Sequence, residues 1–166
     1  MKDIVTERLI VRDVCPGDAE AIFAIWNAKE NRETIGGHQD TYEEVVEICR
    51  DKTRDLTTGI IKVAVLKETD EIIGTCRFGN YGRDYWNFGY NIKSNMWGKG
   101  FATEVLKGII EFGKKEFNVK HFKGGALKEN IASQRVMQKC GMTFCGLDED
   151  GDPDYELILG KELEKE

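Results

Sequence analysis

The sequence predicts a mixed fold of helices and strands, α/β in the broad sense and α+β in the narrower one. Helices are expected to flank one sheet within a single domain. Runs of β-branched and aromatic residues in the middle of the chain alternate with polar residues, which is typical of strands. From Gly100 onward, apolar residues recur at the spacing of a helix. No repeat, low-complexity segment or linker interrupts the 166 residues, so we expect one domain spanning residues 1–166.

The N-terminal part of the chain predicts a strand followed by helices. Leu9–Val11, between two arginines, predict the strand, and Pro16-Gly17-Asp18 supplies a turn and a helix start. Apolar side chains at helical spacing over residues 21–26, and again over 42–49, predict two helices. The polar stretch 27–39 contains two adjacent glycines and is expected to be a loop.

Three strands are predicted in the middle of the chain. Residues 60–66 and 72–78 are β-rich runs joined by the polar connection 67–71, which fits a hairpin. The third strand covers residues 86–92, where aromatic and apolar side chains alternate with asparagine and glycine.

The C-terminal part predicts two helices and three further strands. Phe101–Ile110 present one broad apolar face, which indicates a helix. Asn130 is expected to cap a second helix, and Gly141 to end it. The further strands are predicted at residues 121–127, 142–145 and 155–159.

Composition argues against several classes of protein. Apolar residues make up 40% and charged residues 33% of the chain, and the apolar runs are too short to cross a bilayer, so no membrane role is expected. The acidic Asp3 lies within residues 1–5, and no apolar stretch followed by small residues, as in a secretion signal, occurs there. A cytoplasmic location is therefore expected. The net charge of −6 opposes binding to nucleic acid, whereas it would attract a cationic amine.

Metal and thiol chemistry are not expected. The five cysteines are odd in number, contain no C-x-x-C pair and lie among apolar neighbours, which favours reduced thiols. His38 and His121 are the only histidines, and no motif joins them to a cysteine. The acidic run 148–154 begins like a calcium loop, but Pro153 and Leu159 occupy the glycine and glutamate positions of that motif. A solvated turn is expected, with attraction of a basic acceptor as the alternative.

The segment Asn91–Glu104 carries the most information about function, because it reads as a strand, a short loop and a helix start with Gly98 and Gly100 between them. Near Lys99–Thr103, the N–H groups of a first helical turn have no partner within the helix, and glycine lets an anion approach them. A G-x-G-x-x-G motif would need glycine where Thr103 stands, and no G-x-x-x-x-G-K-[S/T] motif occurs. The pattern favours a phosphate cradle; a glycine-rich helix start without a ligand is the alternative.

The sequence resembles the GNAT superfamily, whose pyrophosphate motif is Q/R-x-x-G-x-G/A, and more closely its ribosomal-protein N-acetyltransferase (Rim-type) branch. That branch carries W-G-K-G-Y-A-T-E where this chain has Trp97-Gly98-Lys99-Gly100-Phe101-Ala102-Thr103-Glu104. The likeness covers nearly the full length. It extends to Thr6–Arg12, to Ile73-Gly74, and to Asn130-x-x-Ser133 followed by Lys139–Met142.

The resemblance implies a mixed, mostly antiparallel, twisted sheet whose central strands splay apart to form an acyl-CoA cleft. It implies acetyl-CoA as cosubstrate, with the pantetheine arm paired to the strand Asn87–Ile92 and the diphosphate on the N–H groups of residues 98–103. Asn130 and Ser133 would lie near the thiol, and both also fit a plain helix start. The implied cofactor-binding residues are Tyr90, Ile92, Trp97, Gly98, Lys99, Gly100, Phe101, Ala102, Thr103, Asn130 and Ser133.

The implied reaction is direct transfer of the acetyl group to a primary amine, either a protein N-terminal α-amino group or a small molecule. A backbone N–H near Tyr90–Ile92 would stabilise the oxyanion. Ser133 is the candidate general acid, with water as the alternative, because Met137 stands where many relatives carry a tyrosine. Some relatives also use a glutamate just before the position of Gly89-Tyr90, where this chain has Asn87-Phe88.

The sequence assigns no general base, and the missing side chains leave a second function open. The candidates, each explained equally well as solvated surface, are Glu33, His38, Asp40 and Asp84. Arg77 and Tyr155 fit either contact with the acceptor or packing. The alternative function is an inactive module that senses acyl-CoA, and a structural domain that binds no CoA is a third. The expected partner is the amine acceptor, and a homodimer is considered as an assembly.

Overall fold

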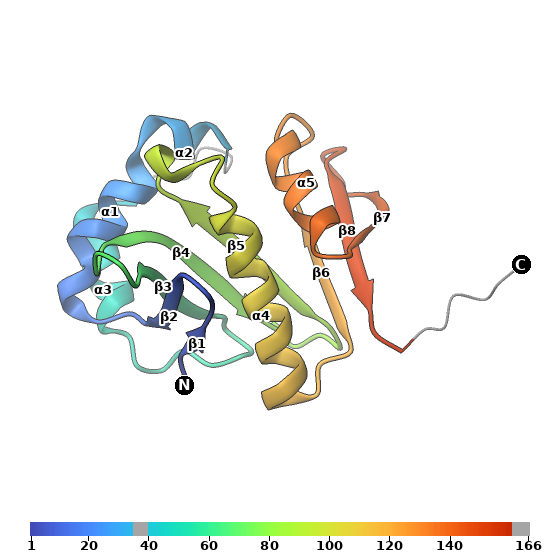
Figure 1. The fold of residues 1–166 in the computed structure, drawn as a ribbon, viewed down its shortest axis with the longest axis horizontal. Helices are drawn as coiled ribbons and strands as arrows, with labels where there is room; N and C mark the ends of the chain where they lie inside the picture. Colours follow the sequence, from blue (N-terminus) through green and yellow to red (C-terminus); the bar gives the residue numbers. More distant parts are fainter. Residues whose placement is uncertain (35–39, 161–166) are drawn as a thin grey trace, which may run out of the picture.

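The computed structural model, which describes residues 1–34 and 40–160, contains one eight-stranded sheet flanked by helices (Figure 1). The strands are β1 (Ile4–Val5), β2 (Leu9–Asp13), β3 (Ile60–Leu66), β4 (Ile72–Gly79), β5 (Trp86–Ile92), β6 (His121–Gly125), β7 (Thr143–Leu147) and β8 (Pro153–Ile158). The helices are α1 (Ala19–Asn27), α2 (Lys29–Thr34), α3 (Tyr42–Arg50), α4 (Phe101–Phe117) and α5 (Ile131–Lys139), with short 3₁₀ turns at Pro16–Asp18 and Ser94–Met96.

The strand order confirms the predicted fold class. The order is β1-β2-β3-β4-β5-β6-β8-β7, and every neighbouring pair is antiparallel except β5 and β6, which run parallel. A parallel pair needs a crossover connection, and α4 supplies it between these two strands.

The two central strands splay apart, as expected. β5 and β6 pair only where Trp86 meets Phe122 and Asn87 meets Lys123, and the Asn87 side chain donates to the Lys123 carbonyl at 3.0 Å. Beyond Asn87, β5 stays paired with β4 while β6 stays paired with β8. The two halves of the sheet therefore separate toward one end, which Figure 1 shows between β5 and β6.

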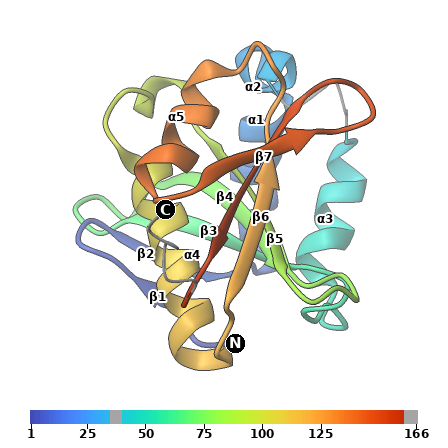
Figure 2. The ribbon, with the colours of Figure 1, turned by 90° about the vertical axis from the view of Figure 1, so that its right-hand side faces the viewer.

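Each face of the sheet has its own apolar core. Helices α4 and α5 lie on one face, and α3 lies on the other with α1 (Figure 2). Leu106 of α4 and Met137 of α5 are fully buried against the first face, while Ile22 of α1 and Val45 of α3 are fully buried against the second. Burying an apolar side chain of this size stabilises the fold by about 1.5–3 kcal/mol. Helix α4 is thus fixed on the sheet by packing along its length.

Several local predictions are confirmed. The turn at Pro16–Asp18 leads directly into α1, the helix over residues 42–49 is α3, and α4 covers the predicted apolar face. The Asn130 side chain accepts from the Ser133 N–H at 3.1 Å and caps α5. Gly141 follows α5 with a φ of +85°, which glycine adopts without strain.

The prediction of a loop over residues 27–39 is wrong for Lys29–Thr34, which form α2. The polar composition of these residues does not predict a helix, because the side chain that holds α2 in place is itself polar and buried. Asn31 is only 2% exposed, and its amide donates to the Ile25 carbonyl at 2.7 Å, near the end of α1. The rest of the predicted loop, residues 35–39 with the two glycines, lies outside the described residues.

The strands also differ from the prediction: β1 was not predicted, and the bounds of β6, β7 and β8 are shifted by one to two residues. β1 consists only of Ile4–Val5, which is too short to show a periodicity, and it forms by pairing with β2. β6 ends at Gly125, two residues earlier than predicted.

We predict that Gly74→Ala destabilises the protein, because Gly74 of β4 lies directly opposite Ile92 of β5. A methyl group at Gly74 would meet the Asn91 carbonyl oxygen at 2.6 Å and the Ile92 Cδ1 atom at 2.8 Å. Urea denaturation should show a loss of about 1–3 kcal/mol in the free energy of unfolding.

The matched control is Gly89→Ala on the adjacent strand, where a methyl group would meet no heavy atom within 4 Å. This variant should unfold within about 0.5–1 kcal/mol of the parent protein, the cost typical of a substitution that clashes with nothing. Equal losses in the two variants would show that the contact across β4 and β5 is not the cause.

Candidate functional site

The glycine pair shapes the loop that enters α4. Gly98 has a φ of +75° and Gly100 a φ of +82°, a region that other residues adopt only at a cost. Both glycines and Lys99 are exposed, and Phe101 begins the helix with its ring buried in the core. The glycines therefore turn the chain sharply between strand and helix without a side chain covering the turn.

The backbone donors of this loop have no internal partner. Gly100 is the N-cap residue of α4 and no side chain caps it. Within the described part of the chain, no acceptor bonds to the N–H groups of residues 98–103, whereas the Glu104 N–H already reaches the Gly100 carbonyl at 3.1 Å. The positive end of a 17-residue helix adds to these exposed donors. Free donors at a helix start are suited to an anion, and the phosphate cradle stays a prediction.

Two side-chain hydrogen bonds hold the loop in place. The Trp97 indole N–H donates to the Ile92 carbonyl at 2.8 Å and ties the loop to the end of β5. On the other side, the Arg8 guanidinium donates to the Lys99 carbonyl at 2.9 Å. Arg8 was not among the predicted site residues, because only its place in the opening motif Thr6–Arg12 set it apart.

The edge of β5 that faces β6 offers free backbone groups. Lys93 donates its N–H to the Ile73 carbonyl at 2.7 Å, and hydrogen-bonded pairs alternate along an antiparallel ladder. Asn91 and Gly89 thus use their backbone groups toward β4, and Tyr90 directs its own toward the gap beside β6. The Ile92 carbonyl points the same way and is already taken by Trp97.

A cavity of about 300 Å³ lies where the two strands separate. Its walls come from β5, from the segment between β6 and α5, from the start of α5, and from the turn between β7 and β8. The lining residues are Phe88, Gly89, Tyr90, Gly125, Ala126, Leu127, Asn130, Ser133, Asp148 and Asp152.

Tyr90 and Ser133 form a hydroxyl pair in the wall of the cavity. Their side-chain oxygens are 2.8 Å apart, and Ser133 is held at the start of α5 by the Asn130 cap. Burial of Tyr90 outweighs its hydrogen bond with Ser133 and raises the pKa of the phenol to about 12. The phenol is therefore a neutral hydrogen-bonding group at physiological pH. No local sequence pattern pairs these two residues, which lie far apart along the chain.

The remaining predicted cofactor residues differ in what they can offer. Ile92 and Phe101 are buried, so only their backbone groups are available. Trp97 is 46% exposed, Lys99 is exposed, and Ala102 and Thr103 are partly buried in the first turn of α4. Met137, at the position of the missing tyrosine, is fully buried in the core and faces no solvent.

None of the described candidate bases lines the cavity. Glu33 and Asp84 are exposed on other parts of the surface, Asp40 follows the undescribed segment, and His38 lies within that segment. Arg77 is exposed, and the buried Tyr155 donates to the Gln134 side chain at 3.3 Å, which supports packing.

The acidic turn between β7 and β8 contributes two carboxylates to the cavity wall instead. The Asp148 carboxylate accepts the N–H groups of Asp150 and Asp152 at 2.9 Å each, which explains the turn without calcium. The Asp152 carboxylate accepts the Lys128 N–H at 2.8 Å and joins the turn to the segment before α5. Sequence reasoning missed both residues as cavity residues, because only the tertiary fold brings this turn beside β5.

Other chemistry finds little support in the described residues. No group of three or more histidine, cysteine, aspartate or glutamate side chains among them is arranged to hold a metal. The five cysteines are free and none lines the cavity, and burial raises the pKa of the Cys140 thiol to about 11. Over the same residues, no helix is long and apolar enough to span a bilayer.

Comparison with known proteins identifies the family. The family model described as an acetyltransferase (GNAT) domain matches residues 8–143, so the chain belongs to the GNAT acetyltransferases. Among curated proteins, the chain is 27% identical to the uncharacterized N-acetyltransferase p20 of Bacillus licheniformis, over 97% of this chain and 91% of that protein.

Solved structures share the same fold. A GNAT-family acetyltransferase from Bacillus anthracis superposes with a TM-score of 0.83 at 22% identity, over 97% of this chain and all of that chain. A structure of AAC(6')-Ib in complex with paromomycin and acetyl-CoA superposes with a TM-score of 0.79 at 17% identity, over 93% and 95% of the two chains. These similarities confirm the arrangement of sheet and helices.

We predict that Tyr90 ionises last, or among the last, of the five tyrosines when the absorbance near the phenolate maximum is followed with rising pH. The folded state raises this pKa, so it favours the neutral phenol. The resulting stabilisation is complete below about pH 10, the ordinary pKa of tyrosine, and is lost as the pH rises toward 12. Tyr90→Phe should remove a late titration step; an unchanged late step would contradict the burial of this hydroxyl.

Proposed function

We propose that this chain is an acetyl-CoA-dependent N-acetyltransferase of the Rim-type branch, formed by one domain over residues 1–166, and that its acceptor is a primary amine. The observation that carries the proposal is the set of unpartnered N–H groups at the start of α4, close in sequence to the splayed end of β5. An anion site and an adjoining open strand edge suit the diphosphate and the amide-rich arm of coenzyme A.

The cofactor would lie across both features. Its diphosphate would accept from the backbone N–H groups of residues 98–103, and its pantetheine arm would pair with the free backbone groups of Tyr90. Asn130 and Ser133, in the wall of the cavity, would then lie near the thioester. Trp97 would act through the backbone, by fixing the Ile92 carbonyl and the loop. The AAC(6')-Ib structure, which holds acetyl-CoA in the same fold, supports this proposal.

The chemistry proposed is direct transfer. An uncharged amine attacks the thioester carbonyl, a backbone N–H on the free edge of β5 stabilises the oxyanion, and the carbon–sulfur bond then breaks to release CoA. The amine loses one proton and the thiolate gains one. A cysteine relay is disfavoured, because no cysteine lines the cavity and burial holds Cys140 protonated.

Ser133 is the proposed proton donor to the leaving thiolate, and Tyr90 is its hydrogen-bonding partner. Proton transfer from the Tyr90 phenol, with a pKa of about 12, to a thiolate whose thiol has an ordinary pKa of about 8.5 would cost roughly 5 kcal/mol. A serine hydroxyl is a weaker acid still, so Ser133 would hydrogen-bond to the thiolate and pass on a proton that its oxygen receives from water in the same step. Tyr90 is better suited to donate a hydrogen bond to the Ser133 oxygen, which leaves the Ser133 hydrogen free to face the sulfur. The proton from the amine would leave through water or the acceptor side of the cavity.

The proposed acceptor is a small-molecule amine or a protein N-terminus. Asp148 and Asp152 in the cavity wall favour an acceptor that carries positive charge, in keeping with the net charge of −6. The structure of AAC(6')-Ib with an aminoglycoside shows that this fold can serve a small amine, which supports the first choice.

We predict that Gly100→Asp abolishes tight CoA binding. The substitution places a side chain at a φ of +82° and a negative charge beside the proposed diphosphate site, so calorimetry should show at least about a hundredfold loss of affinity. The matched control is Gly82→Asp in the turn before β5, which has a φ of +74° and open space around it. Loss of binding in both variants, or in neither, would argue against the proposed phosphate site.

We predict that Ser133→Ala lowers the turnover number by about 10–100-fold and leaves CoA affinity within a factor of about three, because a proton donor acts only in the transition state. The measurement is CoA thiol release with a panel of amines and N-terminal peptides. Equal losses in affinity and turnover would make Ser133 a binding residue. If the parent protein bound CoA but released no thiol with any acceptor, the sensor function would replace the one proposed.

A further inference from the structure

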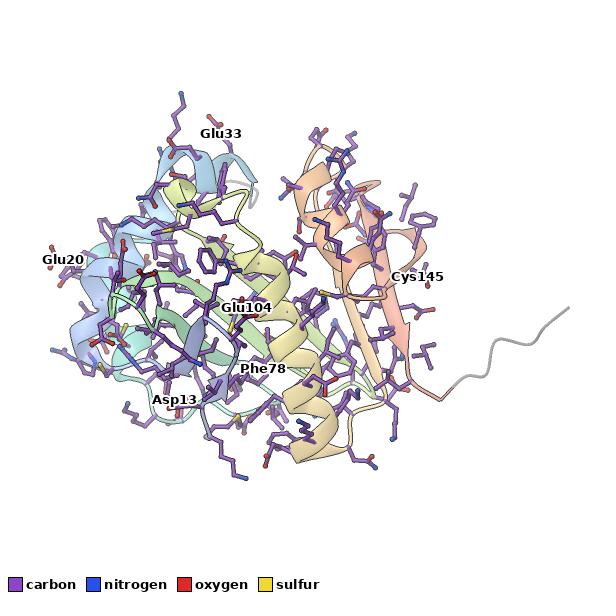
Figure 3. All side chains as sticks on the ribbon, viewed as in Figure 1. Asp13, Glu20, Glu33, Phe78, Glu104 and Cys145 are labelled. Carbon is purple, nitrogen blue, oxygen red and sulfur yellow. The ribbon has the colours of Figure 1, made fainter. Side chains whose placement is uncertain are left out.

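Arg8 lies at the tip of the hairpin between β1 and β2, beside the glycine loop that enters α4. The hairpin is closed by two short bonds: the Thr6 N–H donates to the Leu9 carbonyl at 3.0 Å, and the Leu9 N–H donates to the Thr6 hydroxyl at 3.1 Å. This turn presents Arg8 to the first turn of α4, where Figure 3 labels Glu104.

The Arg8 side chain is held on two sides. Its Nε atom donates to Glu104 Oε1 at 2.8 Å, while its backbone N–H donates to Glu104 Oε2 at 3.0 Å. The guanidinium carbon lies 4.0 Å from the centre of the Phe101 ring. Because the guanidinium is planar and has fixed neighbours on two sides, the direction of its Nη1 atom is fixed as well. Nη1 donates a hydrogen bond to the Lys99 carbonyl at 2.9 Å.

The bond to Lys99 sets the direction of the next N–H group. The carbonyl of Lys99 and the N–H of Gly100 belong to one peptide unit, and in a trans peptide the two groups point in opposite directions. Because the carbonyl turns toward Arg8, the Gly100 N–H must turn away from it. Arg8 therefore fixes the orientation of one of the donors of the proposed diphosphate site.

Arg8 also compensates a charge that would oppose an anion. Glu104 is the acidic residue in the first turn of α4, and its side chain is 16% exposed. Burial disfavours its ionised form, but the hydrogen bonds from Thr6 and Arg8 outweigh burial and hold the Glu104 pKa below its usual value. The carboxylate is thus charged at neutral pH, and the adjacent guanidinium limits its repulsion of a diphosphate.

We propose that Arg8 is a positioning residue for the coenzyme A diphosphate: it orients the Lys99–Gly100 peptide and offsets the charge of Glu104. The inference rests on the proposed function and adds to it a residue outside the glycine loop. Lysine in this place would keep the charge but not the planar arrangement of donors that reaches Glu104 and Lys99 together.

The test is calorimetric affinity for CoA and for dephospho-CoA, which keeps the diphosphate and lacks the 3′-phosphate. Arg8→Gln should weaken binding of both ligands by about tenfold, and Arg8→Lys should recover only part of this loss. The matched control is Arg12→Gln. Arg12 bonds to the Asp18 carboxylate at 2.8 and 3.0 Å and contacts no part of the loop, so this variant should melt at a lower temperature with affinity within about twofold of the parent.

Three results would overturn the inference. Unchanged affinity of Arg8→Gln would show that Arg8 does not shape the site, and losses of affinity shared with Arg12→Gln would assign its effect to the fold. A loss for CoA alone, with dephospho-CoA unaffected, would move Arg8 to the 3′-phosphate. If the parent protein itself bound neither ligand, the proposed function would fail first. If Arg8→Gln does not fold, Arg8→Lys is compared with the parent protein instead. An intermediate loss of affinity is then expected for both ligands.

Discussion

The unpartnered N–H groups at the start of α4 are the constraint on which the functional arrangement depends. A capped donor costs nothing further, but a free donor at a helix start must contact water or a ligand, because burying it without a partner costs about 1–3 kcal/mol. Glycine at residues 98 and 100 keeps side chains away from them, and the absence of a side-chain cap leaves them open. The protein thus keeps a surface on which, in the proposed function, the diphosphate of coenzyme A replaces water.

The sheet brings the start of α4 and the cavity together. Packing of α4 against one face of the sheet fixes where its first turn lies, and the parallel pairing of β5 with β6 ends after Asn87. The strand edge that this leaves unpaired would be a liability in an ordinary sheet, because it exposes backbone donors and acceptors. In the proposed function it provides the surface that the extended arm of coenzyme A completes.

Polar groups around the cavity are satisfied in a way that limits the available chemistry. Tyr90 and Ser133 share a hydrogen bond, the Asp148 and Asp152 carboxylates hold the backbone of their own turn and its neighbour, and no cysteine lines the cavity. The site therefore offers hydrogen bonds and local negative charge rather than a covalent nucleophile. This suits a reaction in which the thioester is already activated and positioning contributes most of the rate.

The sequence by itself determined the features that are local along the chain. Strand alternation, the Asn130 cap, the stop at Gly141 and the glycine-shaped entry to α4 all depend on neighbouring residues, so they could be predicted. Only the tertiary structure brought Arg8 to Lys99, Tyr90 to Ser133, and the acidic turn to the cavity. Helix α2 likewise depends on a tertiary contact, the one made by the buried Asn31 side chain. These contacts join distant segments through packing and register, which no local pattern encodes.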